Sequence, residues 1–264
     1  MKLEAIILAA GMSERFRKIS CEPKVIVKVN SMPLIAYPIT SLKITGVDRM
    51  LIVVNAENKC MIENIIKKYF NDLDVRFVIN DEISRENGYS LYLGFKHVES
   101  DKFFVSMADH IYPPRVLQKI LERDKLGDGD IIIAGDKEPL YVDVEEATLI
   151  ESHNHKVLRV AKGLTSWSYV DAGVFLMKKS IFKLLCEVVK DNYIVKLSDI
   201  LNSAVRKGYR VLVADITGIP WTELDLPKDY YSILHGIRKR VVEEVVEEWE
   251  RLLGNVRTAQ FHAI

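Results

Sequence analysis

Short apolar runs recur along the first half of the chain, with amphipathic segments between them. These runs cover residues 3–8, 50–54, 75–79, 103–107 and 130–134. Almost wholly apolar runs of this length are typical of parallel strands that are covered on both faces. Their alternation with helical segments predicts an α/β fold built on a doubly wound, mostly parallel sheet.

The rhythm changes after about residue 136. Residues 147–150 and 157–160 alternate around a polar turn, which predicts an antiparallel hairpin. Apolar strands return at residues 170–177 and 210–216. The second half should therefore add a small antiparallel extension to the sheet.

We expect a single domain over residues 1–230, divided at about residue 135, followed by a C-terminal helix and tail over residues 231–264. Within about residues 228–253, one stripe at helical spacing carries Ile237, Val241, Val245 and Trp249. The stripe predicts a terminal helix that packs on its own domain. Docking on a partner, or on a second copy in a homodimer, is the alternative.

Composition narrows the function classes. Lys plus Arg and Asp plus Glu number 37 each, so no general positive field exists to hold a nucleic acid. The three cysteines are scattered, which argues against a disulfide framework or a zinc knuckle. No apolar stretch reaches the roughly 20 residues of a spanning helix, and the first residues lack a signal-peptide pattern. We expect a cytoplasmic protein, and the scarcity of Gln beside abundant Lys, Glu, Val and Ile favours a thermophilic one.

The loop after the first strand is the first candidate site. Small residues at Ala9, Ala10 and Gly11 follow Leu8 and let backbone N–H groups approach a ligand's oxygens. Arg15 supplies a planar fork for phosphate oxygens and Lys24 a mobile point charge. An ordinary turn with surface cations is the alternative, but the combination favours a triphosphate site.

Acidic residues form the second candidate site. Asp109 follows the apolar run 103–107, so it should lie at the carboxyl end of a strand, where open α/β sheets bind ligands. Extended alternation would place Glu223 and Asp225 on one side, able to converge on one cation. Carboxylates together with phosphate oxygens suit Mg²⁺. The alternatives are helix caps or turn residues, for Asp109 and for Asp225 alike.

The chain resembles the nucleotidyltransferase (pyrophosphorylase) superfamily, which joins an NTP to a sugar phosphate or a polar alcohol phosphate. Over about residues 3–230 it looks most like the CTP:inositol-1-phosphate cytidylyltransferase branch. The resemblance rests on Leu-Ala-Ala-Gly with Arg15 and Pro23-Lys24, Glu-Asn-Gly-Tyr-Ser-Leu from Glu86, Ala-Asp-His-Ile-Tyr from Ala108, Asp-Ala-Gly-Val-Phe from Asp171 and Trp-Thr-Glu-Leu-Asp from Trp221.

This resemblance implies a Rossmann-like nucleotidyltransferase fold with an NTP-binding half (about residues 1–135) and an acceptor half (about residues 136–230). It implies transfer of a cytidylyl group from CTP to inositol 1-phosphate, giving CDP-inositol and pyrophosphate. Catalysis would fall to Arg15 and Lys24, nucleotide binding to Leu8, Ala9, Ala10, Gly11, Asn80, Gly88 and Ser90, Mg²⁺ binding to Asp109, Asp225 and Glu223, and acceptor binding to Lys162 and Asp171. Asn80 could instead cap a turn, Lys162 could be a solvated lysine and Asp171 a turn residue.

Other members of the superfamily define the alternatives. A sugar-1-phosphate nucleotidyltransferase shares the same first half, and a phosphocholine cytidylyltransferase would need an aromatic cage, for which Trp167, Tyr169 and Trp221 are candidates. A non-catalytic nucleotide-binding homologue is a third reading. The chain departs from the family pattern at two positions. Ser13 stands where many relatives have a second Gly, and Leu149 stands where relatives often have a Lys.

The resemblance also implies that the product would pass to a separate membrane CDP-alcohol transferase.

Overall fold

The computed structural model describes residues 2–18 and 20–253. The strands of its main sheet are β1 (Glu4–Leu8), β4 (Arg49–Val54), β5 (Asp74–Ile79), β6 (Lys102–Met107), β8 (Ile131–Asp136), β9 (Leu149–His153), β10 (Lys156–Ala161), β11 (Tyr169–Lys178) and β12 (Val211–Asp215). Its helices are α1 (Ala36–Ile44), α2 (Lys59–Tyr69), α3 (Glu86–Phe95), α4 (Pro114–Asp124), α5 (Phe182–Asp191), α6 (Leu197–Arg206), α7 (Pro227–His235) and α8 (Lys239–Leu253). Two small pairs join β2 (Lys28–Val29) to β3 (Met32–Pro33), and β7 (His110–Ile111) to β13 (Thr222–Glu223).

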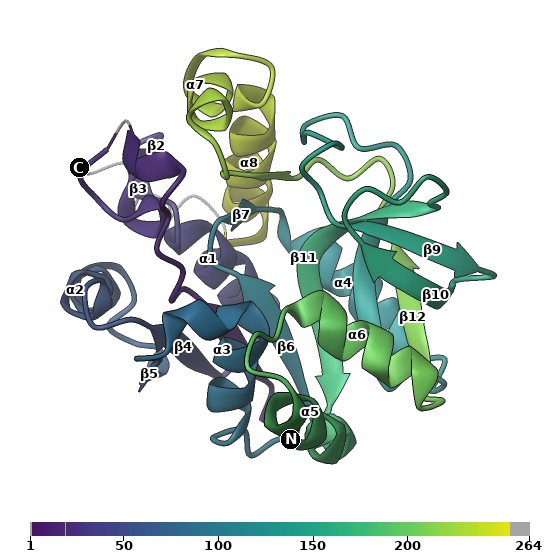
Figure 1. Ribbon diagram of the computed structural model, residues 1–264. Coiled ribbons are helices and arrows are strands. Elements are labelled where there is room, and N and C mark those ends of the chain that lie inside the picture. Colours follow the sequence, from purple (N-terminus) through teal and green to yellow (C-terminus); the bar gives the residue numbers. More distant parts are fainter. Residues whose placement is uncertain (1, 19, 254–264) are drawn as a thin grey trace.

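In the described part of the chain, one nine-stranded sheet has the order β5-β4-β1-β6-β11-β8-β12-β10-β9 (Figure 1). The first four strands are parallel, and Leu8 at the end of β1 lies level with Val53 of β4 and Met107 of β6. Every apolar run predicted as a strand in the first half forms one of these four strands or β8. The α/β class and the doubly wound sheet are therefore confirmed.

The second half adds antiparallel pairings to the same sheet. β11 runs antiparallel between β6 and β8, and β8 is parallel to β12. β9 and β10 form the predicted hairpin; β10 also pairs with β12, and β9 with β11. The pairings of β8, β12, β10, β9 and β11 thus close on themselves, and the antiparallel extension belongs to the main sheet.

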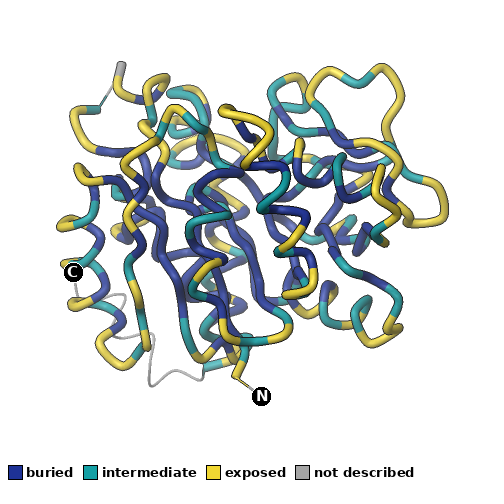
Figure 2. The backbone as a smooth tube through the Cα atoms, turned by 60° about the horizontal axis from the view of Figure 1, so that its bottom comes forward, coloured by how far each residue is buried: buried dark blue, intermediate teal, exposed yellow. Residues whose placement is uncertain are grey.

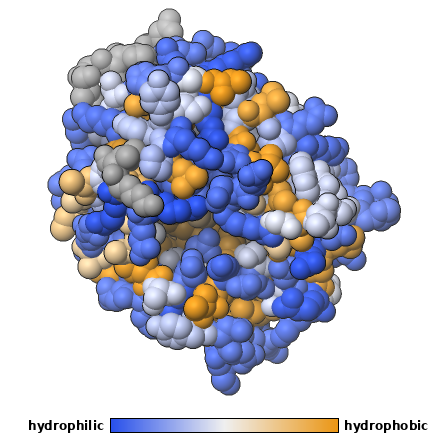
Figure 3. All heavy atoms as spheres, turned by 45° about the horizontal axis from the view of Figure 1, so that its top comes forward, coloured by the Kyte–Doolittle hydropathy of each residue, from blue (hydrophilic) through white to orange (hydrophobic). Residues whose placement is uncertain are grey.

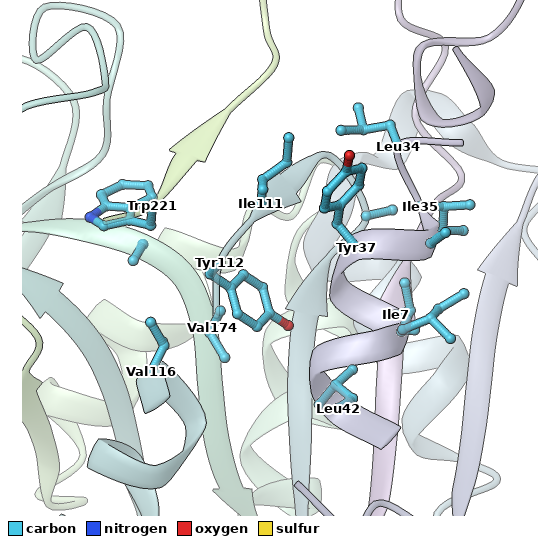
Figure 4. Packing of buried hydrophobic residues seen from close by; sticks show 14 of the residues in the cluster. Ile7, Leu34, Ile35, Tyr37, Leu42, Ile111, Tyr112, Val116, Val174 and Trp221 are labelled. Atoms are coloured by element: carbon cyan, nitrogen blue, oxygen red, sulfur yellow. The ribbon is translucent and has the colours of Figure 1, made fainter. Parts of the chain in front are cut away.

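Alternate residues of the strands face two separate cores. Ala5 and Ile7 of β1 pack with side chains of α1, α2, α4 and α8, whereas Ile6 and Leu8 pack with those of α3, α5 and α6. Figure 2 shows the buried strands inside, with exposed residues along the loops and the outer sides of the helices. In Figure 4, Leu42 of α1 lies beside Ile7 of β1. Each face of the sheet is thus covered, as its apolar strands require.

The terminal segment forms two helices, α7 and α8, instead of continuing as one. Ile237, predicted on the apolar stripe, lies between them and is 70% exposed. Val241, Val245 and Trp249 of α8 are buried in the core that α1 and α4 share. This face of α8 therefore packs on its own chain and is not free to bind a second copy. None of the described helices is long and apolar enough to cross a membrane.

Trp249 should contribute strongly to stability. Its indole nitrogen donates to Ser41 Oγ at 3.1 Å, and its ring lies 5.4 Å from that of Tyr37. We expect Trp249→Ala to lower the free energy of unfolding by about 3 to 5 kcal/mol, because it leaves a cavity between α8 and α1. Chemical denaturation would measure the loss. Leu252→Ala on the exposed side of the same helix is the control, and equal effects of the two substitutions would contradict the packing described.

Candidate active site

Lys24 lies between two carboxylates that come from distant parts of the chain. Its Nζ is 2.6 Å from Asp109 Oδ2 and 2.8 Å from Asp225 Oδ1. Asp109 follows the carboxyl end of β6, and Asp225 lies between β13 and α7. Lys24 itself begins a short 3-10 helix, and its backbone N–H donates to Ser13 Oγ. Three residues that the sequence predicted for the site are thus in direct contact.

The charges of this cluster stabilise one another. Burial alone would lower the pKa of Lys24, but the carboxylates of Asp109 and Asp225 more than offset it, so the pKa lies above its ordinary value. Burial alone would raise the pKa of Asp109, but Lys24 and His110 hold it well below the usual range. Lys24 is therefore an ammonium and Asp109 a carboxylate throughout the neutral range.

Arg15, in the segment that follows β1, joins the cluster of Lys24, Asp109 and Asp225. Its guanidinium lies 3.2 Å from Asp225 Oδ2 and 2.9 Å from Glu146 Oε2, and its side chain is half exposed. Asp225 therefore contacts both predicted catalytic cations. Glu146 was not predicted, because nothing in the sequence near it indicates a partner 131 positions away.

His110 links the remaining acid to the cluster. Its Nδ1 lies 2.7 Å from Asp109 Oδ1 and its Nε2 lies 3.3 Å from Glu223 Oε2. The pairing of β7 with β13 sets His110 opposite Glu223. Burial alone would lower the pKa of His110, but Asp109 and Glu223 raise it to about 9, whereas burial raises the pKa of Glu223 to about 7. No role was predicted for His110. Its position directly after Asp109 was the only feature of the sequence that could have indicated a contact between the two side chains.

Two buried asparagines fix the loop after β1. Asn55 Nδ2 donates to Ala10 O at 2.9 Å, and Asn58 Nδ2 donates to Ala9 O at 2.7 Å. Each asparagine also accepts the backbone N–H of the other. Two carbonyls of the loop are thereby turned toward the protein. Sequence reasoning missed this pair, which lies after β4 and about 45 positions from the loop.

Gly11 and Ser13 complete this loop. A Cβ built on Gly11 would meet no atom within 4 Å, so the space beside it is open. Ser13 has a φ of +57°, the left-handed region that favours glycine. This backbone explains why a Gly suits the position, and the Ser Oγ accepts the N–H of Lys24 in compensation.

The predicted base-reading residues lie around the start of α3. The side-chain amide of buried Asn80 donates to Ser90 Oγ at 2.9 Å, and Asn80 Oδ1 accepts the N–H of Glu82. Gly88 donates its N–H to Val195 O, and a Cβ there would lie 2.6 Å from that oxygen. Gly88 thus allows close packing against Val195, and its N–H is already donated to Val195 O and is not available to a ligand.

The two predicted acceptor residues differ in setting. Asp171 Oδ1 accepts the N–H of Gly173 at 2.8 Å. Burial raises the pKa of Asp171 to about 6, against the opposing effects of that hydrogen bond and of His110. Lys162 is exposed after β10, and no ion pair joins it to another described residue. Asp171 is therefore within electrostatic reach of the cluster, whereas Lys162 is not held against it by any such contact.

The cluster has the donor chemistry for a hard cation. Asp109, Asp225 and Glu223 offer carboxylate oxygens, which Mg²⁺ prefers. The ammonium of Lys24 already binds two of these acids as a cation. In the arrangement that the structure has, with Lys24 between Asp109 and Asp225, no group of three or more described His, Cys, Asp or Glu residues could hold a metal ion. The acids fit a divalent cation if Lys24 moves away from between them.

Seen from the side of α7 and the loops above the sheet, the surface is largely hydrophilic, with scattered apolar patches (Figure 3). The phosphocholine alternative predicted an aromatic cage. Trp221, one of its candidates, is buried and stacks on His110 at 6.0 Å between ring centroids. Its ring faces are therefore engaged within the protein.

The chain is similar to known proteins over most of its length. A family model described as "MobA-like NTP transferase domain" matches residues 5–193. The chain is 31% identical over 225 residues to the bifunctional IPC transferase and DIPP synthase of Thermococcus kodakarensis, covering 85% of this chain and 48% of that protein. The protein of the same name from Aquifex aeolicus is 29% identical over 242 residues, covering 91% and 53%. The chain thus spans about half the length of these curated relatives.

A solved structure extends the comparison to three dimensions. The inositol-1-phosphate CTP transferase from T. maritima matches with a TM-score of 0.82 and 29% identity, covering 92% of this chain and 98% of that chain. The resemblance predicted from the sequence motifs is therefore confirmed, together with the nucleotidyltransferase fold.

Asp171 should make stability depend on pH. Burial raises its pKa from 3.8 to about 6, so the folded protein holds this proton more tightly than the unfolded chain. Its stabilising contribution is present below about pH 4 and is lost as the pH rises through about 6. We expect Asp171→Asn, which resembles the protonated acid, to match the wild type at pH 4 and to exceed it by about 2 to 3 kcal/mol at pH 8.

Urea denaturation across this pH range would measure the difference. Asp191→Asn at the exposed end of α5 is the control and should show no such trend. A constant difference between Asp171→Asn and the wild type at all pH values would contradict the raised pKa.

Proposed function

Because the chain belongs to the MobA-like NTP transferase family, we propose that it transfers a cytidylyl group from CTP to inositol 1-phosphate. The products would be CDP-inositol and pyrophosphate. The observation that carries the proposal is the buried contact of Lys24 with Asp109 and Asp225 beside the open loop at Gly11. Similarity to the inositol-1-phosphate CTP transferase from T. maritima over nearly the whole of both chains supports this pair of substrates.

The reaction needs no proton-abstracting base. An oxygen of the acceptor's phosphate monoester, which is largely anionic near neutral pH, attacks the α-phosphorus of CTP. A new P–O bond forms there as the bond to the β-phosphate oxygen breaks, and pyrophosphate leaves with the electron pair. The residues therefore have to position the phosphates and neutralise charge.

Lys24 and Arg15 would supply the positive charge. Lys24 would neutralise charge that develops at the α-phosphoryl group, and Arg15 would hold the leaving β- and γ-phosphates with its planar fork. Both cations now contact Asp225. Nucleotide binding would thus exchange carboxylate partners for phosphate partners.

Mg²⁺ is the metal that we propose, held by Asp109 and Asp225 with Glu223. When bound, it would neutralise phosphate charge as a Lewis acid. Lys24 binds Asp109 and Asp225, and the pairing of β7 with β13 sets Glu223 opposite His110, the residue after Asp109. The chain's own contribution is to bring three carboxylates from two distant segments to the phosphate loop.

The remaining residues would bind the two substrates. Leu8, Ala9, Ala10 and Gly11 would form the phosphate loop, and Ser90 with Asn80 would face the base. Gly88 would contribute by packing α3 close to Val195, so that this end of the helix has a fixed position. Asp171 would bind hydroxyls of the acceptor and Lys162 its phosphate.

The location of the enzyme and the use of its product can also be proposed. We propose a cytoplasmic, heat-adapted enzyme whose product is consumed by a membrane CDP-alcohol transferase. The curated relatives have DIPP synthase in their names beside IPC transferase. A DIPP synthase activity is accordingly the consumer to test.

Pyrophosphate release should reveal the substrates and depend on Lys24. We expect release with CTP and inositol 1-phosphate to exceed release with the other three nucleotides, with glucose 1-phosphate or with phosphocholine. Lys24→Ala should lower turnover by about 10²- to 10³-fold, because it removes charge stabilisation at the α-phosphate. Lys28→Ala, an exposed lysine four residues on, is the matched control. Preference for a purine nucleotide or for phosphocholine would overturn the substrates, and full activity of Lys24→Ala would overturn the site.

Gly11→Ala should separate folding from nucleotide binding. The added Cβ meets no protein atom within 4 Å, so we expect an unchanged melting temperature. The same methyl group would intrude where phosphates approach the backbone and should raise KM for CTP by about 10- to 100-fold, the effect of one lost charged hydrogen bond. Steady-state kinetics with thermal denaturation would decide, and an unchanged KM would place the phosphates elsewhere.

A further inference from the structure

His110 is the one described side chain that contacts both Asp109 and Glu223. We propose that it is a positioning residue, which orients these two carboxylates for a divalent cation. The inference rests on the proposed function, because it concerns the acids that would bind Mg²⁺. It assigns His110 no part in bond making, since both of its ring nitrogens already face carboxylates.

The contact with Asp109 divides the work of the two carboxylate oxygens. Oδ1 lies 2.7 Å from His110 Nδ1, whereas Oδ2 lies 2.6 Å from the Lys24 ammonium. Because Oδ1 faces His110, the oxygen that faces Lys24 at the centre of the cluster is Oδ2. Mg²⁺ demands near-octahedral geometry at short distances, so a fixed oxygen is worth more to it than a rotating carboxylate.

The contact with Glu223 serves the same purpose from the other strand. His110 Nε2 lies 3.3 Å from Glu223 Oε2, and the two residues are directly opposite each other in the β7–β13 pair. The register of the β7–β13 pair sets the distance between the two strands, and the imidazole of His110 lies between Asp109 and Glu223. One ring therefore fixes two acids that the sequence separates by 114 positions, from 109 to 223.

The imidazole is itself held by two neighbours, Trp221 and Gly173. Trp221 stacks on it with an angle of 9° between the rings, and the Trp221 indole nitrogen donates to Asp136 Oδ2 at 2.9 Å. Gly173 lies so close that a Cβ there would be 2.5 Å from His110 Nε2. The ring therefore has no room to turn. Its fixed orientation in turn restricts the orientation of the two carboxylates that it contacts.

Loss of a residue that orients metal ligands without touching the metal typically lowers metal affinity by about 10- to 100-fold. The experiment compares binding of α,β-methylene-CTP, which cannot release pyrophosphate, in EDTA and with Mn²⁺. The ratio of the two dissociation constants measures how much the metal strengthens nucleotide binding. We expect His110→Phe, which keeps a flat ring beside Trp221, to reduce this ratio by about 10- to 100-fold and to leave binding in EDTA unchanged.

Two further variants test the contacts one at a time. His110→Asn places an amide near the position of Nδ1, toward Asp109, and His110→Gln places one near Nε2, toward Glu223. Each should lose less of the Mn²⁺ effect than His110→Phe. In turnover, the variants should need more Mg²⁺ for half-maximal rate while kcat at saturating Mg²⁺ stays within a few-fold of the wild type, a split that simple loss of structure would not give.

The outcomes separate this inference from the proposed function. An unchanged Mn²⁺ ratio in those His110 variants that keep the wild-type melting temperature would overturn the positioning role. So would a wild type that binds the analogue equally well in EDTA and in Mn²⁺ but still releases pyrophosphate from CTP, since the proposed reaction would then stand. A wild type that neither binds the analogue nor turns over CTP would overturn the proposed function itself.

Discussion

The ammonium of Lys24 is the interaction on which the site depends. Asp109, Asp225 and Glu223 come from two segments more than 100 residues apart, and their charges would repel one another in a buried place. Lys24 lies within 2.8 Å of two of them and offsets that repulsion. Its own position is fixed by the loop after β1, through Ser13. The loop that would bind phosphates therefore also holds the acids together.

The small β7–β13 pair connects the two halves of the domain at this point. β7 follows β6 of the first half, and β13 follows β12 of the second. Trp221, just before β13, ties the pair to Asp136 at the end of β8. Because β8 and β12 are neighbours in the sheet, any shift of the second half would be felt at Glu223 and Asp225. The predicted acceptor half and the acids proposed for Mg²⁺ are thus connected through this pair of strands.

Local patterns were sufficient for the strands of the main sheet and for part of the site, but not for the short pairs β2–β3 and β7–β13. Apolar runs predicted β1, β4, β5, β6 and β8, and the rule that ligands bind at the carboxyl ends of parallel strands placed Asp109 beside the Gly11 loop. The break between α7 and α8 was missed because residues 228–253 keep a helical stripe across it. Asn55 and Glu146 were missed for another reason: their partners lie elsewhere in the chain, and no spacing in the sequence encodes such contacts. His110 follows Asp109 directly, but its contact with Glu223 across the β7–β13 pair could not be read from the sequence.

The same reasoning explains why the two substrates are unequally defined. The phosphate loop, Lys24 and Asp109 are placed by a few neighbouring strands whose register is fixed, and both cations are already paired with acids. An incoming triphosphate would draw these cations away and leave the acids in need of a new positive charge, so charge balance couples nucleotide binding to metal binding. The residues proposed for the acceptor are held differently from each other. Asp171 lies in β11, where its N–H donates to Thr148 O and its Oδ1 accepts the N–H of Gly173. Lys162 is exposed after β10, and no ion pair joins it to another described residue, so a change at Lys162 would disturb the cluster less than a change at Asp171.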